Sequence, residues 1–274
     1  MPPLEALVAA GHEVTLVVTG SDRRRGRGAT TSPSPVKAAA LELDLPVSHR
    51  LEDLEEVDAA LGVVVAYGRI LSAAVLEPRP YVNLHFSLLP RWRGAAPVEW
   101  AILEGDERTG VCVMAVEEGL DTGGVYAKAE TDVDAKTLEG LRGELVSIGS
   151  ELLVEVLAAA EGVGGEARLP TPSPQDGEVT YARKLTAEDR VLRWDRPAVE
   201  LERVVRIGGA TTTVEGRRLK VLAAALDPVP GSVAVPCASG ALHLVEVQPE
   251  GKRPMSGGDW LRGLRRSDPP PLGT

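Results

Sequence analysis

The sequence is poor in aromatic residues. They make up 3% of its 274 residues, and Phe86 is its one phenylalanine. The hydrophobic core must therefore be built mainly from Val, Leu, Ile and Ala. The hydrophobic share of 43% is still enough for a sizeable core, and the length suits two domains.

Cysteine is scarce, and long apolar runs are missing. Cys112 and Cys237 lie far apart without metal-ligand spacing, so we expect two buried thiols in a reducing compartment. No apolar run reaches the roughly 18 residues that a membrane span needs. No signal-peptide pattern is visible at the first residues. We therefore expect a cytoplasmic protein without a membrane partner.

Positive charge is in deficit overall. The net charge of -10 argues against a general affinity for nucleic acids. The deficit is uneven: from Leu185 onward 13 basic residues face 11 acidic ones, so the preceding part carries the acidic excess. This asymmetry fits two parts with different tasks, and it fits chance composition as well.

Helical and strand patterns alternate over the first 160 residues or so. Helices are predicted over 3–11, 36–45, 53–62, 71–78, 97–106 and 137–162. Strands are predicted over 12–20, 46–50, 63–67 and 81–86, with two more around the turn at 117–124. This alternation predicts an α/β domain with a largely parallel sheet.

The composition changes after residue 163. Residues 163–177 are rich in Gly, Pro and Ser and resemble a linker. Short strands separated by Gly-containing turns follow, which is typical of a small β-barrel or sandwich. We therefore divide the chain into an N-terminal α/β domain (1–163), a linker (164–184) and a C-terminal β-barrel domain (185–274).

One segment concentrates polar groups at the end of a predicted strand. Asn83 and His85 alternate along "YVNLHF", so their side chains share one face near the strand's carboxyl end, where α/β sheets bind ligands. Asp121 lies in the turn "EEGLDTGG". Asn and His could stabilise the oxyanion of a carbonyl under attack, and Asp could orient the imidazole or take up a proton. An Asn-x-His pattern alone is more often structural, and no Ser or Cys, Ser87 included, is marked as a covalent nucleophile.

Longer strings point to a family. "VVVAYGRIL", "NLHFSLLPRWRGAAPVEWAILEGDERTGV", "EEGLDTGG", "TYARKLTAEDRVLRWD" and "LVEVQPEGKRPMSGGDWLRG" resemble signature segments of methionyl-tRNA formyltransferase. So does "GRG" followed by "SPSPVK". The strings keep the family's order along nearly the whole chain. The catalytic strings are shared by a wider set of enzymes that use 10-formyltetrahydrofolate, whereas the "GRG" loop and the C-terminal segments are more specific.

The resemblance implies a fold and a reaction. It implies a Rossmann-like formyltransferase domain followed by a small OB-like β-barrel domain. The α-amine of methionyl initiator tRNA would attack the formyl carbon of 10-formyltetrahydrofolate directly, for translation initiation, without a metal. Asn83, His85 and Asp121 match the family's catalytic trio. The family's folate-contacting loop matches Ser87, Leu88, Leu89 and Pro90.

The basic loop "SDRRRGRG" resembles the family's RNA-inserting loop. Arg27 falls at the position of an acceptor-stem contact, and Arg23, Arg24 and Arg25 would neutralise phosphates. The C-terminal residues Lys252, Arg253, Arg262, Arg265 and Arg266 form either a second RNA-binding surface or an ordinary solvated face. A local patch can bind RNA while the remaining surface stays acidic. We expect a monomer, because no oligomerisation signal is visible.

The sequence departs from the family in three places. Relatives begin with a strand close to "FAGTPEFA", which is central in a doubly wound sheet, and this strand has no match here. Each buried backbone group left unpaired would cost on the order of 1–3 kcal/mol, so we expect the reading frame to start upstream. Phe86 stands where relatives have small residues, and "RVVRIGGATTTVEG" replaces a longer segment with Trp.

Two rival functions remain open at this point. A formyl-folate enzyme acting on another amine would share "NLHFSLLP" and Asp121, but would lack the basic loop and the β-rich C-terminal part. An inactive RNA-binding remnant would keep Arg27 and the C-terminal part without turnover. The intact trio argues against the remnant, and the missing strand argues for it.

Overall fold

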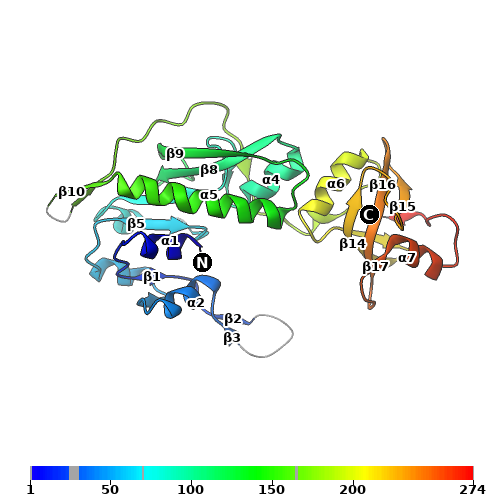
Figure 1. The fold of residues 1–274 in the computed structure, drawn as a ribbon, viewed down its shortest axis with the longest axis horizontal. Helices are drawn as coiled ribbons and strands as arrows, with labels where there is room; N and C mark the ends of the chain where they lie inside the picture. Colours follow the sequence, from blue (N-terminus) through cyan, green and yellow to red (C-terminus); the bar gives the residue numbers. More distant parts are fainter. Residues whose placement is uncertain (1, 25–30, 70, 164–165, 274) are drawn as a thin grey trace. The chain divides into compact units, whose positions relative to one another are not determined.

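The computed structural model describes residues 2–24, 31–69, 71–163 and 166–273 (Figure 1). The chain forms two compact units. Unit 1 comprises residues 1–97, 109–131 and 143–182, and unit 2 comprises residues 98–108, 132–142 and 183–274.

Most predicted helices form, with shorter bounds than expected. They are α1 (Pro2–Ala9), α2 (Pro35–Glu42), α3 (Ala73–Leu76), α4 (Pro97–Glu104) and α5 (Leu138–Ala158). Helix α2 starts at Pro35, one residue before the predicted start, because the Ser34 hydroxyl accepts a hydrogen bond from the Lys37 N–H and Pro35 occupies the first turn. Gly11 and Gly105, just past α1 and α4, adopt positive φ, as glycines following a helix often do.

The helix predicted over 53–62 is wrong. Only a 3₁₀ helix, η1 (Glu52–Glu56), forms there, and it has no buried residue. Four of its five residues are acidic, so like charges meet on successive turns and no apolar stripe is available for packing.

The strands of unit 1 form a four-stranded sheet and several separate two-stranded pairs. Strands β5 (Gly62–Val65), β6 (Tyr81–His85), β8 (Arg108–Ala115) and β9 (Val125–Asp132) form a four-stranded sheet in that order. The β5–β6 pair is parallel and β8 joins β6 antiparallel. A separate parallel pair joins β1 (Val17–Val18) to β4 (Val47–Ser48). Within the described residues, β1 pairs with β4 alone and β5 with β6 alone.

Helix α5 covers one face of the four-stranded sheet (Figure 1). A Cβ placed on Gly149 of α5 would lie 3.0 Å from both the Leu84 and Val111 side chains, so the glycine permits a close approach. Leu84 therefore faces α5. Since side chains alternate along β6, Asn83 and His85 face the opposite side.

Several short strand pairs complete unit 1. Strand β2 (Arg23–Arg24) pairs antiparallel with β3 (Thr31–Ser32), and β10 (Glu161–Val163) pairs antiparallel with β11 (Glu166–Arg168). The long helix predicted to residue 162 thus ends at Ala158, before β10. Strand β7 (Arg93–Gly94) pairs in parallel with β12 (Tyr181–Ala182).

Unit 2 is built on an antiparallel sheet that curls into a half-barrel. Its order is β15 (Val233–Pro236), β16 (Ala241–Pro249), β14 (Arg217–Ala225), β13 (Thr211–Val214) and β18 (Leu272–Gly273), with β17 (Met255–Ser256) on β16. Helices α6 (Ala198–Arg206) and α7 (Gly257–Gly263) pack on it. Leu201, Leu219, Leu244 and Trp260 are among the buried residues of its core.

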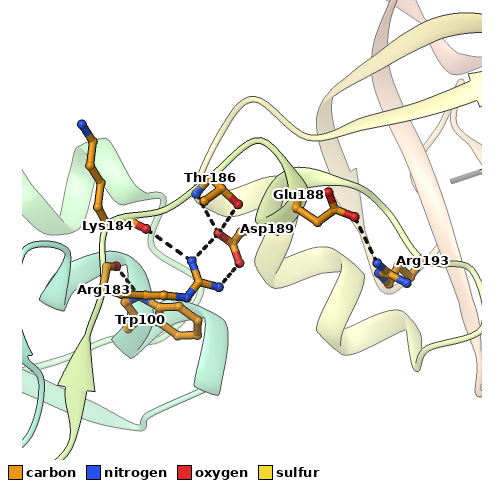
Figure 2. A network of polar contacts seen from close by, with 7 residues as sticks. All are labelled: Trp100, Arg183, Lys184, Thr186, Glu188, Asp189 and Arg193. Atoms are coloured by element: carbon orange, nitrogen blue, oxygen red, sulfur yellow. Dashed lines mark hydrogen bonds and ion pairs between the residues drawn. The ribbon is translucent and has the colours of Figure 1, made fainter.

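A polar network joins α4 to the chain entering unit 2 (Figure 2). The Arg183 guanidinium lies 4.9 Å from the centre of the Trp100 ring and donates two hydrogen bonds to Asp189, at 2.5 and 2.8 Å. The Trp100 indole N–H donates to the Arg183 carbonyl at 2.8 Å. Thr186 donates to Asp189 from its backbone N–H and its hydroxyl. These bonds hold the pKa of the Asp189 carboxyl well below its ordinary range.

Candidate active site

Strand β6 presents Asn83 and His85 from the middle of the sheet. Tyr81, Val82, Leu84 and His85 are buried, and Asn83 is half-buried. In the antiparallel pairing with β8, Asn83 lies opposite Met114 and His85 opposite Cys112. Residues paired in this way share a face of the sheet, so Cys112 and Met114 lie beside the two polar side chains.

The floor of the site is apolar. Leu89, Cys112 and Met114 form a buried cluster, against which Val125 packs. Burial raises the pKa of the Cys112 thiol to about 11, so the thiolate is not populated near neutral pH. Cys112 is therefore an unreactive packing residue. The prediction of two buried thiols is confirmed for Cys112 and wrong for Cys237, which is half-buried at the edge of the unit 2 core.

The loop after β6 turns back sharply over the strand end. The Leu89–Pro90 peptide is cis, and Trp92 adopts a positive φ of 63°. Ser87 is fully buried, and its hydroxyl donates to the Arg91 carbonyl at 2.6 Å. Ser87 thus stabilises the turn. Of the four residues assigned to folate contact, Ser87, Leu89 and Pro90 have buried side chains and Leu88 is half-buried.

The structure brings His85 and Asp121 together. The His85 Nδ1 lies 3.7 Å from the Asp121 Oδ2, and the two side chains are 6% and 15% exposed. The His85 Nε2 lies 2.9 Å from the Trp92 carbonyl oxygen. Because a carbonyl only accepts, Nε2 must carry a proton, and Nδ1 is then the atom that titrates.

Two opposing effects set the protonation of His85. Burial lowers the pKa of its imidazole below the ordinary value of 6.5, and this is the largest effect. The Asp121 carboxylate and the hydrogen bond to the Trp92 carbonyl raise the pKa in the opposite direction. The pair can therefore hold one additional proton between Nδ1 and Oδ2, next to a half-buried amide on the same face.

The Asn83 side chain is half-buried on β6. Within the part of the chain that the structure describes, its side-chain amide has no hydrogen-bond partner. The position on β6 places the amide on the same face as His85. An amide N–H there is suited to a carbonyl oxygen on which negative charge develops.

A strap formed by residues 172–182 crosses the site loops, where the composition predicts only a linker. The Trp92 N–H donates to the Thr180 hydroxyl at 2.9 Å, and the Arg93 N–H donates to the Thr180 carbonyl at 2.9 Å. Val125 and Ser173 exchange two backbone hydrogen bonds. The Pro-rich composition suggested a linker. One local signal could have revealed the strap. Thr180 opens the string "TYARKL" at the boundary with the C-terminal part, which is a family-like string and not a random linker sequence.

The structure describes only some of the basic residues that were assigned to RNA binding. Arg23 and Arg24 form β2, whose backbone pairs with β3. Arg25 and Arg27 lie outside the described residues. In unit 2, Arg262 pairs with Asp259, and Arg266 pairs with Glu215 at 2.9 Å.

In the described ranges, no three or more His, Cys, Asp or Glu side chains are grouped so as to hold a metal ion. Nor does any described helix have the length and apolarity to cross a membrane.

Comparison with known proteins defines the class first. Residues 4–157 match the family model described as formyl transferase, and residues 184–265 match the formyl transferase C-terminal domain. The fold and these matches define a formyl-transferring enzyme.

Curated relatives that match over the full chain identify the family within this class. The methionyl-tRNA formyltransferase of Ruegeria pomeroyi is 41% identical over 297 aligned residues, covering 100% of this chain and 95% of that protein. The chain belongs to the methionyl-tRNA formyltransferase family.

Solved structures share the fold at lower identity. The methionyl-tRNA formyltransferase from Clostridium thermocellum has a TM-score of 0.56 and 18% identity, covering 78% of this chain and 94% of that one. An N-formyltransferase from Helicobacter canadensis, in complex with folinic acid and dTDP-3-aminofucose, has a TM-score of 0.66 and 14% identity. The match covers 90% of this chain and 94% of that structure, and it supports the fold alone.

Proposed function

We propose that this enzyme transfers the formyl group of 10-formyltetrahydrofolate to the α-amine of methionyl initiator tRNA. Family membership over the full chain supports this reaction. The observation that carries it is the placement of His85 3.7 Å from Asp121, on the face of β6 that also bears Asn83. Acting on initiator tRNA places the enzyme in the cytoplasm, where translation starts.

The reaction is a direct attack through a tetrahedral species. The amine nitrogen bonds to the formyl carbon while the carbonyl oxygen gains negative charge, which the Asn83 amide stabilises. The bond from the formyl carbon to the folate nitrogen then breaks. The amine loses one proton and the departing nitrogen gains one, so a group that accepts and returns a proton suffices. The His85–Asp121 pair has this property, and no metal is required.

His85 has a second role in its protonated state. Its Nε2–H is engaged by the Trp92 carbonyl, so only a proton on Nδ1 is available to the reacting atoms. That proton is shared between the Asp121 carboxylate and the developing oxyanion. The imidazolium therefore stabilises the tetrahedral species and then supplies the proton that the leaving nitrogen needs.

Folate binds along the loop of Ser87, Leu88, Leu89 and Pro90. Three of these side chains are buried, so backbone groups and the half-buried Leu88 make the contact. The arginines of the loop at 23–27 bind the acceptor end of the tRNA, with Arg27 as the principal contact, by neutralising phosphates. We propose domains 1–163 and 185–274 and a monomeric state, with a connecting segment 164–184 of which residues 172–182 pack on the site loops.

The rival acceptor to be tested is a nucleotide-linked amino sugar. The N-formyltransferase from Helicobacter canadensis, whose structure holds dTDP-3-aminofucose, shares this fold. An acceptor assay separates the two functions: the enzyme receives 10-formyltetrahydrofolate together with methionyl initiator tRNA, methionyl elongator tRNA or a nucleotide-linked amino sugar. We expect formylation of the initiator tRNA alone. Formylation of the sugar without that of the tRNA would overturn the proposal.

A further inference from the structure

The Gln175 side chain of the strap hydrogen-bonds to both loops of the site. Its Oε1 accepts two hydrogen bonds from the Arg93 guanidinium, at 2.6 and 3.0 Å. Its Nε2 donates to the carbonyl oxygens of Asp121 and Gly123, both at 2.8 Å. The orientation of the amide is fixed chemically, because guanidinium only donates and carbonyls only accept. Every hydrogen-bonding position of the Gln175 amide plane is thereby used.

These contacts close a ring around the catalytic carboxylate. The Gly94 N–H, next to Arg93, donates to the Asp121 Oδ2 at 2.7 Å. Asp121 is therefore held at two points. Gly94 binds its carboxylate directly, and Arg93 binds its backbone carbonyl indirectly, through Gln175. The Oδ2 atom that Gly94 binds is the one that faces His85.

Asp121 needs such support. Its φ is 50°, in the left-handed region that costs a non-glycine residue free energy. Its loop is also seated closely, because a Cβ on Gly123 would lie 2.0 Å from the Ala115 carbonyl oxygen. A hydrogen bond to each of the two carbonyls, at Asp121 and Gly123, opposes rotation of the intervening peptides.

We infer that Gln175 is a positioning residue for the reaction: together with Arg93 it holds Asp121 at the distance and orientation that the His85 imidazole requires. This inference rests on the proposed function of the His85–Asp121 pair. Gln175 itself does not touch the reacting atoms. It acts by keeping Oδ2 beside Nδ1, and a displacement of the order of 1 Å at a reacting pair can cost roughly 100-fold in rate.

Two substitutions separate the two halves of the contact. Gln175→Glu keeps an acceptor for Arg93 but cannot donate to the Asp121 and Gly123 carbonyls. Gln175→Met keeps the length of the side chain, removes all the hydrogen bonds and adds no charge. The matched control is Asp176→Asn, which changes an exposed neighbour on the same strap.

The first readout is steady-state formyl transfer. We expect both Gln175 variants to lower kcat by roughly 10- to 100-fold while KM for each substrate changes less than about twofold. The control keeps the kcat of the unmodified enzyme. An unchanged kcat in both Gln175 variants would overturn the inference.

The second readout is the titration of His85 followed by NMR, which requires no turnover. In Gln175→Met the carboxylate moves away from Nδ1, so the pKa of His85 falls relative to the unmodified protein. A lower kcat with an unchanged His85 titration would mean a merely structural role and would also overturn the inference. If the unmodified enzyme formylated no acceptor, the proposed function would fail, and the titration would still decide whether Gln175 positions Asp121.

Discussion

The charge of Asp121 is the part of the site whose effect on His85 can be estimated most directly. Asp121→Asn removes the charge and keeps the shape and the hydrogen bond from the Gly94 N–H. In the native site this carboxylate raises the pKa of His85 against the opposing effect of burial. Without the charge, burial acts alone, and the pKa must fall further below its ordinary value.

The size of the fall follows from the geometry. Two unit charges about 4 Å apart interact by roughly 4 kcal/mol at an effective dielectric constant of 20. This energy is an upper bound, because the Asp121 side chain is 15% exposed and retains solvent screening. We therefore expect the pKa of His85 to fall by less than this bound allows.

NMR titration of the imidazole signals measures this shift. The chain has four histidines, so the His85 signal is assigned by its absence in His85→Ala. A His85 pKa that stays the same or rises in Asp121→Asn would refute the electrostatic coupling. We also expect kcat to fall by roughly 10²- to 10⁴-fold, since the proton-accepting carboxylate is gone.

The lowered pKa of His85 in the folded protein also affects the dependence of stability on pH. The pKa of folded His85 lies below its unfolded value, so between these two values the unfolded chain binds more protons. Stability therefore rises with pH through that window and is lost as the pH falls from about 6.5. In Asp121→Asn the window extends to lower pH, because the folded pKa is lower still.

Four further predictions concern other parts of the chain. Gly143→Ala should raise the free energy of unfolding by roughly 0.5–1 kcal/mol, because a Cβ there meets open space; Gly149→Ala on the same helix should give a smaller gain or a loss, because its Cβ would lie 3.0 Å from the Leu84 and Val111 side chains, which must shift. Denaturant titration of both compares them, and equal changes would refute the packing argument. Cys112→Ala should leave kcat within about threefold, because the thiol is protonated and only packs; a loss of 10²-fold or more would assign it a chemical role. Asp189→Asn should lower Tm most above pH 5 and least near pH 2, since the stabilising carboxylate is lost as pH falls through its low pKa; a pH-independent decrease would contradict this. Arg27→Ala should weaken tRNA binding and reduce its salt dependence, and an unchanged salt slope would exclude a phosphate contact.

Strand β6 was predictable for local reasons. The string "YVNLHF" fixes a strand and places Asn83 and His85 on one face by alternation alone. The helix predicted over 3–11 likewise ends for a local reason, the positive φ of Gly11. The prediction of a helix over 53–62 was wrong. Its leucines and alanines suggested a helical period, but four acidic residues leave η1 without a buried face.

The remainder depends on contacts between distant residues. Asp121 lies 36 positions from His85, and their 3.7 Å separation results from how the 117–124 turn is seated. Gln175 is 82 residues from Arg93 and 54 from Asp121. It lies in a Pro-rich stretch whose composition is typical of a linker. No local periodicity signals that one side chain there joins both loops.

Single-turnover formyl transfer to methionyl initiator tRNA tests the central claim most directly. The unmodified enzyme, His85→Ala and Cys112→Ala are compared at saturating 10-formyltetrahydrofolate, with tRNA binding measured on the same samples. The proposed mechanism predicts transfer by the unmodified enzyme, a decrease of roughly 10²- to 10³-fold in His85→Ala, and near-normal tRNA binding in both variants. Transfer by His85→Ala at close to the unmodified rate would contradict it.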